Sequence, residues 1–317
     1  MTPISKIKKC YIMRIKMLVY VVWAFVLALG VQSCHQPDVL PEAVRYPILF
    51  GSSDSRAVAT LDSLKTEGFR VHAYFKGEGA ATFNHDVNYQ KVNGEDIWAL
   101  SSPEYWIPGV TYWFKAFYPK DLAEDITFDD GKSQSYSIND YDIRAQKDIM
   151  VASPDALTVP ADGVAPTSGS VVKLAFQHLL ANVTIKAKSE IGNVTVSDIS
   201  LEDIAQTGNY SNGKWESEQT VTINKQYSGE ALVKNAEDFV DITGGGFLVI
   251  PEAIGGRQRM IIRTSHKNYD VVIPTITWEP GKKYTYTLTI KQENIEFNEP
   301  GVDIWDEENA TGSVVIK

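Results

Sequence analysis

The sequence predicts an all-β protein with two β-sandwich domains in tandem. Short runs of β-branched and aromatic residues recur roughly every 8–12 residues, and each run is bounded by Gly, Pro, Asn or Asp. The 317 residues are 44% hydrophobic and 11% aromatic, which suffices to fill such cores. No heptad or longer repeat is present. Short strands at this spacing, separated by turn residues, are typical of β-sandwiches.

A basic leader precedes the predicted strands. Its apolar block, Leu18–Val31, is shorter than the roughly 20 residues that a membrane-spanning helix needs, and it fits the central region of a secretory signal. The block ends at Val31-Gln32-Ser33-Cys34, which resembles a bacterial lipobox, a signal whose cysteine is acylated and becomes the new N-terminus. We therefore expect a lipoprotein signal peptide over residues 1–33 and lipid on Cys34. The alternative is an ordinary signal peptide with an unmodified cysteine.

Charge and cysteine content exclude several classes of function. The leader holds five of the 30 Lys and Arg residues and none of the 40 Asp and Glu residues, so the rest of the chain is strongly acidic. Nucleic acid binding needs a basic surface, and we expect no nucleic acid partner. The only cysteines are Cys10 and Cys34. The exported domains therefore carry no disulfide and no cysteine-based metal site.

The mature chain begins with a tether and a first strand. Residues 34–43 contain two prolines and no periodicity, which is typical of a flexible linker. Val44–Gly51 is an apolar run that predicts a strand. Because Pro47 cannot donate a ladder hydrogen bond, this strand is expected to lie at an edge or to start late. It opens the predicted N-terminal sandwich, residues 44–169.

The remaining strands of the first domain follow from alternation and turn signals. Phe69–Phe75 alternates apolar and polar residues, which predicts a half-buried strand. Asn93-Gly94 predicts a hairpin within Asn88–Leu100. Val110–Tyr118 is a long run of β-forming residues. Shorter predicted strands are Tyr136–Ile143 and Asp148–Ala152, and the domain ends with the Pro- and Gly-rich residues 154–169.

The second domain, residues 170–317, begins with Val171–Lys188. This segment alternates at both ends, and its middle, Gln177–Asn182, is compatible with a helical turn, although the flanks favour β structure. Trp278–Lys282 predicts a turn before the last long strand. The predicted strands of this domain are Ile191–Leu201, Thr220–Asn224, Phe247–Ile250, Met260–Thr264, Tyr269–Ile273 and Tyr284–Ile290.

No motif in the sequence supports catalysis. The five histidines are scattered, and we expect His178 to be a hydrogen-bonded core or edge residue. Gly244–Gly246 precedes a strand rather than a helix, so it predicts a bend rather than a phosphate loop. Asp125–Gly131 resembles part of an EF-hand, but Tyr136 stands where a bidentate glutamate is needed. The aromatic residues of Trp106–Tyr118 are compatible with a carbohydrate platform, but their alternation favours a core. We predict no enzyme activity, catalytic residue, metal or cofactor.

Several segments, in their order and spacing, resemble the fimbrillin family, the lipoprotein pilin and fimbrial subunits of Bacteroidales. The resemblance covers nearly the whole mature chain, and it implies Greek-key, transthyretin-like sandwiches and a role in adhesion. The segments that carry it are the lipobox at Cys34, Arg56-Ala57, Asp148–Ala152, Leu174–Ala181, Phe247–Pro251, Trp278–Tyr286 and Trp305.

The resemblance also implies an assembly mechanism. An arginine-specific protease cuts the exported lipoprotein, the first strand is lost, and a strand of the next subunit takes its place. In this sequence the matching cleavage site is Arg56 and Ala57, with Arg45 as a second possible site that would leave the strand attached. A plain loop arginine is the alternative for Arg56. The displaced strand would contain Val44, Ile48, Leu49 and Phe50, and the donor segment, residues 302–317, would contain Val302, Ile304, Val314 and Ile316.

The implied partners are other copies or related fimbrial subunits, and a host or bacterial surface ligand. The implied location is the outer membrane, through lipid on Cys34, and then the extracellular fimbrium. The alternative function is a non-polymerising surface lipoprotein, an anchor or a tip adhesin that binds glycan or protein through exposed aromatic residues such as Trp106. Asp62-Ser63-Leu64 also resembles an O-glycosylation signal of this bacterial group.

Overall fold

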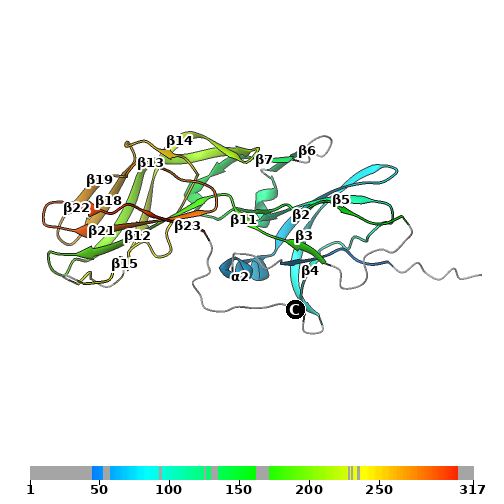
Figure 1. The fold of residues 1–317 in the computed structure, drawn as a ribbon, viewed down its shortest axis with the longest axis horizontal. Helices are drawn as coiled ribbons and strands as arrows, with labels where there is room; N and C mark the ends of the chain where they lie inside the picture. The colour runs from blue at the N-terminus through cyan, green and yellow to red at the C-terminus, as the bar shows by residue number, and fades with distance from the viewer. Residues whose placement is uncertain are drawn as a thin grey trace, which may run out of the picture. The chain divides into compact units, whose positions relative to one another are not determined.

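The structure is a computed structural model that describes residues 45–52, 58–92, 95–124, 126–129, 135–161, 171–227, 229, 231–233 and 236–305. The described residues from Tyr46 to Trp305 belong to one unit, and Figure 1 labels its helices and strands. The predicted all-β class is confirmed. In the described ranges, the helical elements are α2 (Val58–Glu67) and the short 3-10 helices η1 (Lys120–Glu124) and η2 (Ile143–Ala145). No helix in these ranges is long and apolar enough to cross a bilayer.

The largest sheet of the described chain has nine strands. It joins strands from the beginning of the fold to two strands that follow residue 170. Its order is β10 (Val171–Leu174), β1 (Leu49–Ser52), β4 (Glu95–Leu100), β3 (Ala80–Val92), β2 (Phe69–Lys76), β5 (Thr111–Tyr118), β8 (Met150–Ala152) and β11 (Gln177–His178), with β9 (Leu157–Thr158) also paired to β5.

The other described strands form two six-stranded sheets and one two-stranded sheet. The second sheet has the order β15 (Val240–Asp241), β12 (Ala181–Ser189), β21 (Lys282–Ile290) and β22 (Ile295–Phe297), with β16 (Phe247–Val249) on β12 and β23 (Gly301–Ile304) on β21. The third has the order β19 (Asn268–Val272), β18 (Arg259–Thr264), β13 (Val196–Ser211), β7 (Ser135–Asp142) and β6 (Ile126–Asp129), with β14 (Lys214–Gln226) on β13. The small sheet pairs β17 (Ala253–Ile254) with β20 (Ile276–Thr277).

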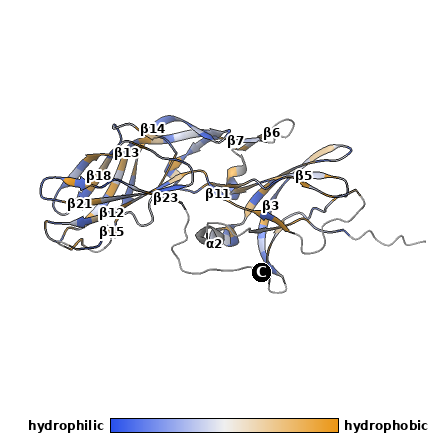
Figure 2. Cartoon of the chain, in the orientation of Figure 1, coloured by the Kyte–Doolittle hydropathy of each residue, from blue (hydrophilic) through white to orange (hydrophobic). Residues whose placement is uncertain are grey.

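Two hydrophobic cores hold the described residues together. One core contains the inner side chains of β1, β2, β5 and their neighbours in the first sheet. The other contains the inner side chains of β12, β21, β13 and β18, together with residues of β6 and β7. Apolar and polar residues alternate along these strands, as the colours of Figure 2 show. The predicted boundary after residue 169 remains a prediction, and strands on both sides of it share sheets.

The strongest local predictions are confirmed. The predicted strand Phe69–Phe75 is present as β2, and its Phe69, Val71 and Ala73 are buried. The predicted hairpin is present, because β3 and β4 pair antiparallel with Val92 opposite Glu95. The predicted strand Val110–Tyr118 becomes β5, with alternating burial along most of its length.

Three local features differ from the prediction. The helix α2 was not predicted; Gly68, at φ 72°, donates its amide to the Leu64 carbonyl and ends it. Val171–Lys188 is divided into β10, β11 and β12 rather than continuous. The predicted strand Ile191–Leu201 begins later and runs to Ser211, because β13 forms a long hairpin with β14.

Candidate functional site

The first strand lies inside the largest sheet. β1 pairs parallel with β10 and antiparallel with β4, so the expectation of an edge position is wrong. The alternative expectation of a late start is confirmed, since the strand begins at Leu49, and Pro47 makes only an isolated bridge to Tyr105. Pro47 needs no ladder donor there, because its neighbours supply the bonds: Ile48 donates to the Glu104 carbonyl.

Two alternate side chains seat this strand in the core. Ile48 is 2% exposed and Phe50 is fully buried. The Phe50 ring packs edge-to-face against Phe114, with centroids 5.5 Å apart, and against Phe69, with centroids 6.4 Å apart. Leu49 lies between them in sequence and is only half-buried. The strand is therefore held by one apolar face and by backbone bonds on both of its edges.

The described part of the predicted donor segment is a surface strand. β23 pairs antiparallel with β21, with Val302 opposite Tyr284 and Ile304 opposite Lys282. Val302 is 49% exposed and Ile304 is 53% exposed. The strand thus presents two large apolar side chains to solvent at the same spacing as the buried pair of β1. The next residue, Trp305, is buried.

Six residues of the predicted processing and exchange sites lie outside the described residues. These are Cys34, Val44, Arg56, Ala57, Val314 and Ile316. The roles assigned to them remain predictions. In the chain, Arg56 and Ala57 fall in the connection between β1 and α2.

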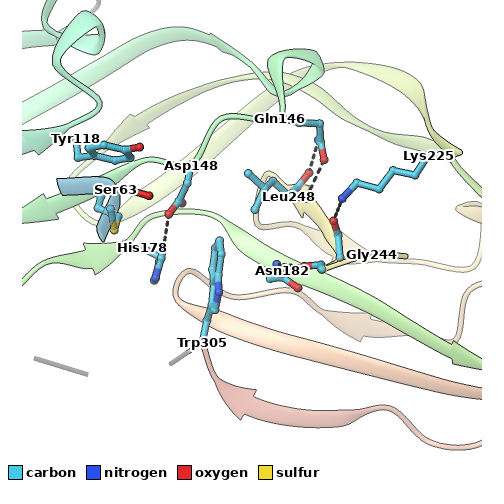
Figure 3. A pocket seen from close by; sticks show the side chains of 13 residues that line it. Ser63, Tyr118, Gln146, Asp148, His178, Asn182, Lys225, Gly244, Leu248 and Trp305 are labelled. Atoms are coloured by element: carbon cyan, nitrogen blue, oxygen red, sulfur yellow. Dashed lines mark hydrogen bonds and ion pairs between the residues drawn. The ribbon is translucent and has the colours of Figure 1, made fainter. Parts of the chain in front are cut away.

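A polar pocket of about 300 Å³ borders Trp305. Figure 3 shows its labelled side chains, with Asp148 directed toward His178 and the Trp305 indole beside the His178 ring. The distance from His178 Nδ1 to Asp148 Oδ2 is 2.6 Å. The imidazole stacks on the indole with centroids 3.8 Å apart and an interplanar angle of 13°. The prediction that His178 is a hydrogen-bonded core residue is confirmed, because the residue is 6% exposed.

The ends of this pocket differ in charge. At one end, burial raises the pKa of Tyr118 to about 12, and the hydrogen bond from its hydroxyl to Glu67 adds to the shift. At the other end, burial lowers the pKa of the Lys225 ammonium, which donates to the Gly246 carbonyl. The Asp148 carboxylate, the His178 imidazole and the Lys225 amine line the same cavity.

The pocket does not assemble a nucleophilic triad. Ser63, Asp148 and His178 all line it, and the Asp148–His178 bond has the geometry that orients an imidazole base. However, His178 Nε2 is buried and has no hydrogen-bond partner, so Ser63 does not bond to it. Ser63 lies in α2 and faces the pocket.

Three sequence hypotheses about ligands have clear outcomes. Trp106 is 6% exposed and packs edge-to-face on Tyr112, so the idea of a surface platform that uses Trp106 is wrong and the core interpretation is confirmed. Gly244–Gly246 forms the predicted bend, with positive φ at all three residues. The EF-hand-like segment contains the strand β6, and no cluster of metal-binding side chains occurs in the portion of the chain that the structure covers.

Sequence reasoning did not connect Asp148, His178 and Trp305. They belong to separate segments of the resemblance, and nothing local links them. The one available signal was His178, a histidine within an apolar segment. A buried imidazole needs a hydrogen-bond partner, and the sequence does not show which residue supplies it.

Comparison with solved structures confirms the fold. A fimbrial protein from Bacteroides vulgatus is 15% identical, with 83% of this chain and 100% of that chain covered and a TM-score of 0.55. A candidate cell adhesion protein from Bacteroides uniformis is 17% identical, with 84% and 99% covered and a TM-score of 0.54. A candidate cell adhesion protein from Bacteroides ovatus is 13% identical, with 83% and 98% covered and a TM-score of 0.55.

Comparison of the sequence gives the family. No curated protein matches the sequence significantly. The model of the family described as fimbrillin-like matches residues 56–305, which include every described strand except β1. That match spans most of the chain, and the chain therefore belongs to the fimbrillin-like family.

Proposed function

We propose that the chain is a structural subunit of a cell-surface fimbria and that it polymerises by strand exchange. Its membership of the fimbrillin-like family supports the fimbrial role and the surface location. The fold that it shares with a fimbrial protein supports the same role. In this role the chain supplies scaffold and adhesion surface, and it performs no chemistry.

The observation that carries the proposal is a match of spacing between two strands. The segment of β1 fills the core with Ile48, the residue just before the strand, and with Phe50, two residues later. β23 exposes Val302 and Ile304, also two residues apart. Side chains of a strand alternate between faces, so either pair projects from one face of an extended segment. The strand β23 therefore has apolar side chains at the spacing needed to fill the position that β1 occupies.

Loss of β1 would create a strong demand for a replacement. The facing edges of β10 and β4 would each present unpaired N–H and C=O groups, and the core around Phe114 would open to water. A strand from another copy satisfies both needs. Because the donor and acceptor surfaces differ, this contact is head-to-tail, and it grows a filament rather than closing.

The proposed order of events starts at the membrane. The precursor is exported as a lipoprotein anchored through Cys34, and an arginine-specific protease then cuts between Arg56 and Ala57. This cut separates β1 from α2, so β1 can leave together with the lipid. A cut after Arg45 would instead leave β1 joined to the fold.

The test is proteolysis of the purified protein followed by gel analysis in mild SDS. Trypsin-like protease should trim the chain once near Arg56 and give a ladder of oligomers, and Arg56→Gln should prevent both. A double variant with Val302→Asp and Ile304→Asp should be trimmed but remain monomeric. Val272→Asp is the matched control, because Val272 is 45% exposed on the edge strand β19, and this variant should polymerise normally.

A trimmed wild-type protein that stays monomeric would refute polymerisation. That result would favour the alternative, a non-polymerising anchor or tip adhesin that keeps its first strand. N-terminal sequencing of the protein on cells gives a second test, because the proposal requires a free Ala57 rather than a lipid-modified Cys34.

A further inference from the structure

The attachment of the C-terminal strand depends on one side chain. All four residues of β23 are exposed, whereas Trp305, immediately after them, is 6% exposed. The Trp305 amide donates to the Gly281 carbonyl at 2.8 Å, which continues the pairing with the start of β21. A strand that buries no side chain of its own gains little from burial. Trp305 therefore provides most of the apolar contact that holds this segment in place.

The indole is received by side chains of the first sheet. We call His178 and Asp148 the aromatic socket. His178 belongs to β11 and pairs with Met150 of β8, which fixes its backbone in that sheet. Asp148 holds the imidazole through Nδ1 at 2.6 Å, and the imidazole stacks on Trp305 at 3.8 Å. Stacked aromatic rings attract one another beyond the area that they bury. The socket thus presents a preset, flat surface to the indole.

Two features of the aromatic socket indicate that its contact with the Trp305 indole opens. Asp148 Oδ1 and His178 Nε2 are buried without hydrogen-bond partners, which is unfavourable while the indole covers the site. Pockets of about 300 Å³ and about 370 Å³ both border His178 and Trp305, so the indole has open volume beside it. Withdrawal of the indole would expose these two polar atoms to water.

We propose that the aromatic socket is an indole-binding site that latches the tail onto its own sheet. Withdrawal of Trp305 from the socket is the step that frees β23 for a neighbouring copy. This inference rests on the proposed function for its purpose, but the latch itself is a property of the single chain. In this proposal, the contacts among Trp305, His178 and Asp148 determine the fraction of molecules in which β23 is detached from β21.

Hydrogen exchange measured by mass spectrometry tests the latch without polymerisation. In Trp305→Ala, the peptides that contain β23 and its partner residues in β21 should exchange at least about tenfold faster than in the wild type, because they lose their anchor. Peptides of β13 and β18, which belong to the same core as Trp305, should not change. Trp305→Phe keeps a stacking ring, and its exchange should stay near the wild-type rate. His178→Gln removes the stack from the other side and should give an intermediate, roughly threefold to tenfold increase.

Trp113→Ala is the matched control. Trp113 is a half-buried indole on β5 that packs against Tyr74 at 5.4 Å, and its loss should leave exchange at β23 unchanged. Unchanged exchange at β23 in both Trp305→Ala and His178→Gln would overturn the latch. Equal acceleration in β13 and β18 would also overturn it, because Trp305 would then be an ordinary residue of the core that those strands form.

The same variants separate this inference from the proposed function. Faster exchange at β23 combined with no oligomers after proteolysis would support the latch and refute strand donation. Oligomers that form at the wild-type rate from Trp305→Ala, with unchanged exchange, would refute the latch and leave strand donation intact. If Trp305→Ala does not fold, His178→Gln and Trp305→Phe still decide the outcome by the order of their exchange rates.

Discussion

Replacing Phe50 with alanine measures how firmly the first strand is seated. The ring is fully buried and makes edge-to-face contacts with Phe69 and Phe114. Truncation of a buried phenylalanine costs about 3–5 kcal/mol through lost transfer energy and the cavity that remains. The two ring contacts add about 1 kcal/mol each to what is lost, which places the expected cost in the upper half of that range. We therefore expect the free energy of unfolding to fall by about 4 kcal/mol.

Urea denaturation followed by circular dichroism provides the measurement. The midpoint should fall while the slope with denaturant stays constant, because the surface exposed on unfolding hardly changes. Leu49→Ala is the matched control on the same strand. Its side chain is half-buried, so it should cost only about 1 kcal/mol.

The same number predicts the behaviour of the processed protein. Once the chain is cut after Arg56, β1 is held only by non-covalent contacts, and a loss of about 4 kcal/mol weakens its retention by about three orders of magnitude. Native mass spectrometry should detect free fragment from Phe50→Ala at a protein concentration far higher than the one at which the wild type begins to lose it, because the variant complex has the higher Kd. A loss below about 1 kcal/mol in unfolding, or an equal loss in Leu49→Ala, would refute the reasoning from burial.

Two further predictions concern the second core. Gly246→Ala should destabilise the fold by about 2 kcal/mol, because φ is 95° and a Cβ would lie 2.3 Å from Asn182 Oδ1; Gly245→Ala has a similar φ but open space, and unfolding experiments should show a smaller loss. Burial raises the pKa of Glu252, although its carboxylate accepts a hydrogen bond from the Ala205 amide. A raised pKa in the fold means that stability is lost as pH rises through it, so Glu252→Gln should gain stability relative to the wild type as pH rises above 4.5, the ordinary value of a glutamate. A difference in unfolding free energy between the two proteins that does not change as pH rises from below to above 4.5 would contradict the prediction.

Local pattern was sufficient for individual strands. The alternation in Phe69–Phe75 and the turn residues Asn93-Gly94 each predict the element that forms, because side-chain period and turn chemistry are properties of neighbouring residues. The apolar run Val44–Gly51 likewise predicts the first strand, but only the structure shows that Ile48 and Phe50 are its buried residues. The sequence signal for the helix α2 is weaker than the signals for these strands. Its clearest part is Gly68, which ends the helix.

The sequence by itself therefore determined the all-β class and most of the described strands, since these depend on composition and short-range periodicity. Only the tertiary structure decided that β1 is enclosed between β4 and β10, whose residues lie far apart in the chain. It alone brought Asp148, His178 and Trp305 together. Strand order, and contacts between side chains more than a hundred residues apart, depend on which apolar surfaces bury one another best. Local sequence patterns do not encode this, because each pattern involves only neighbouring residues.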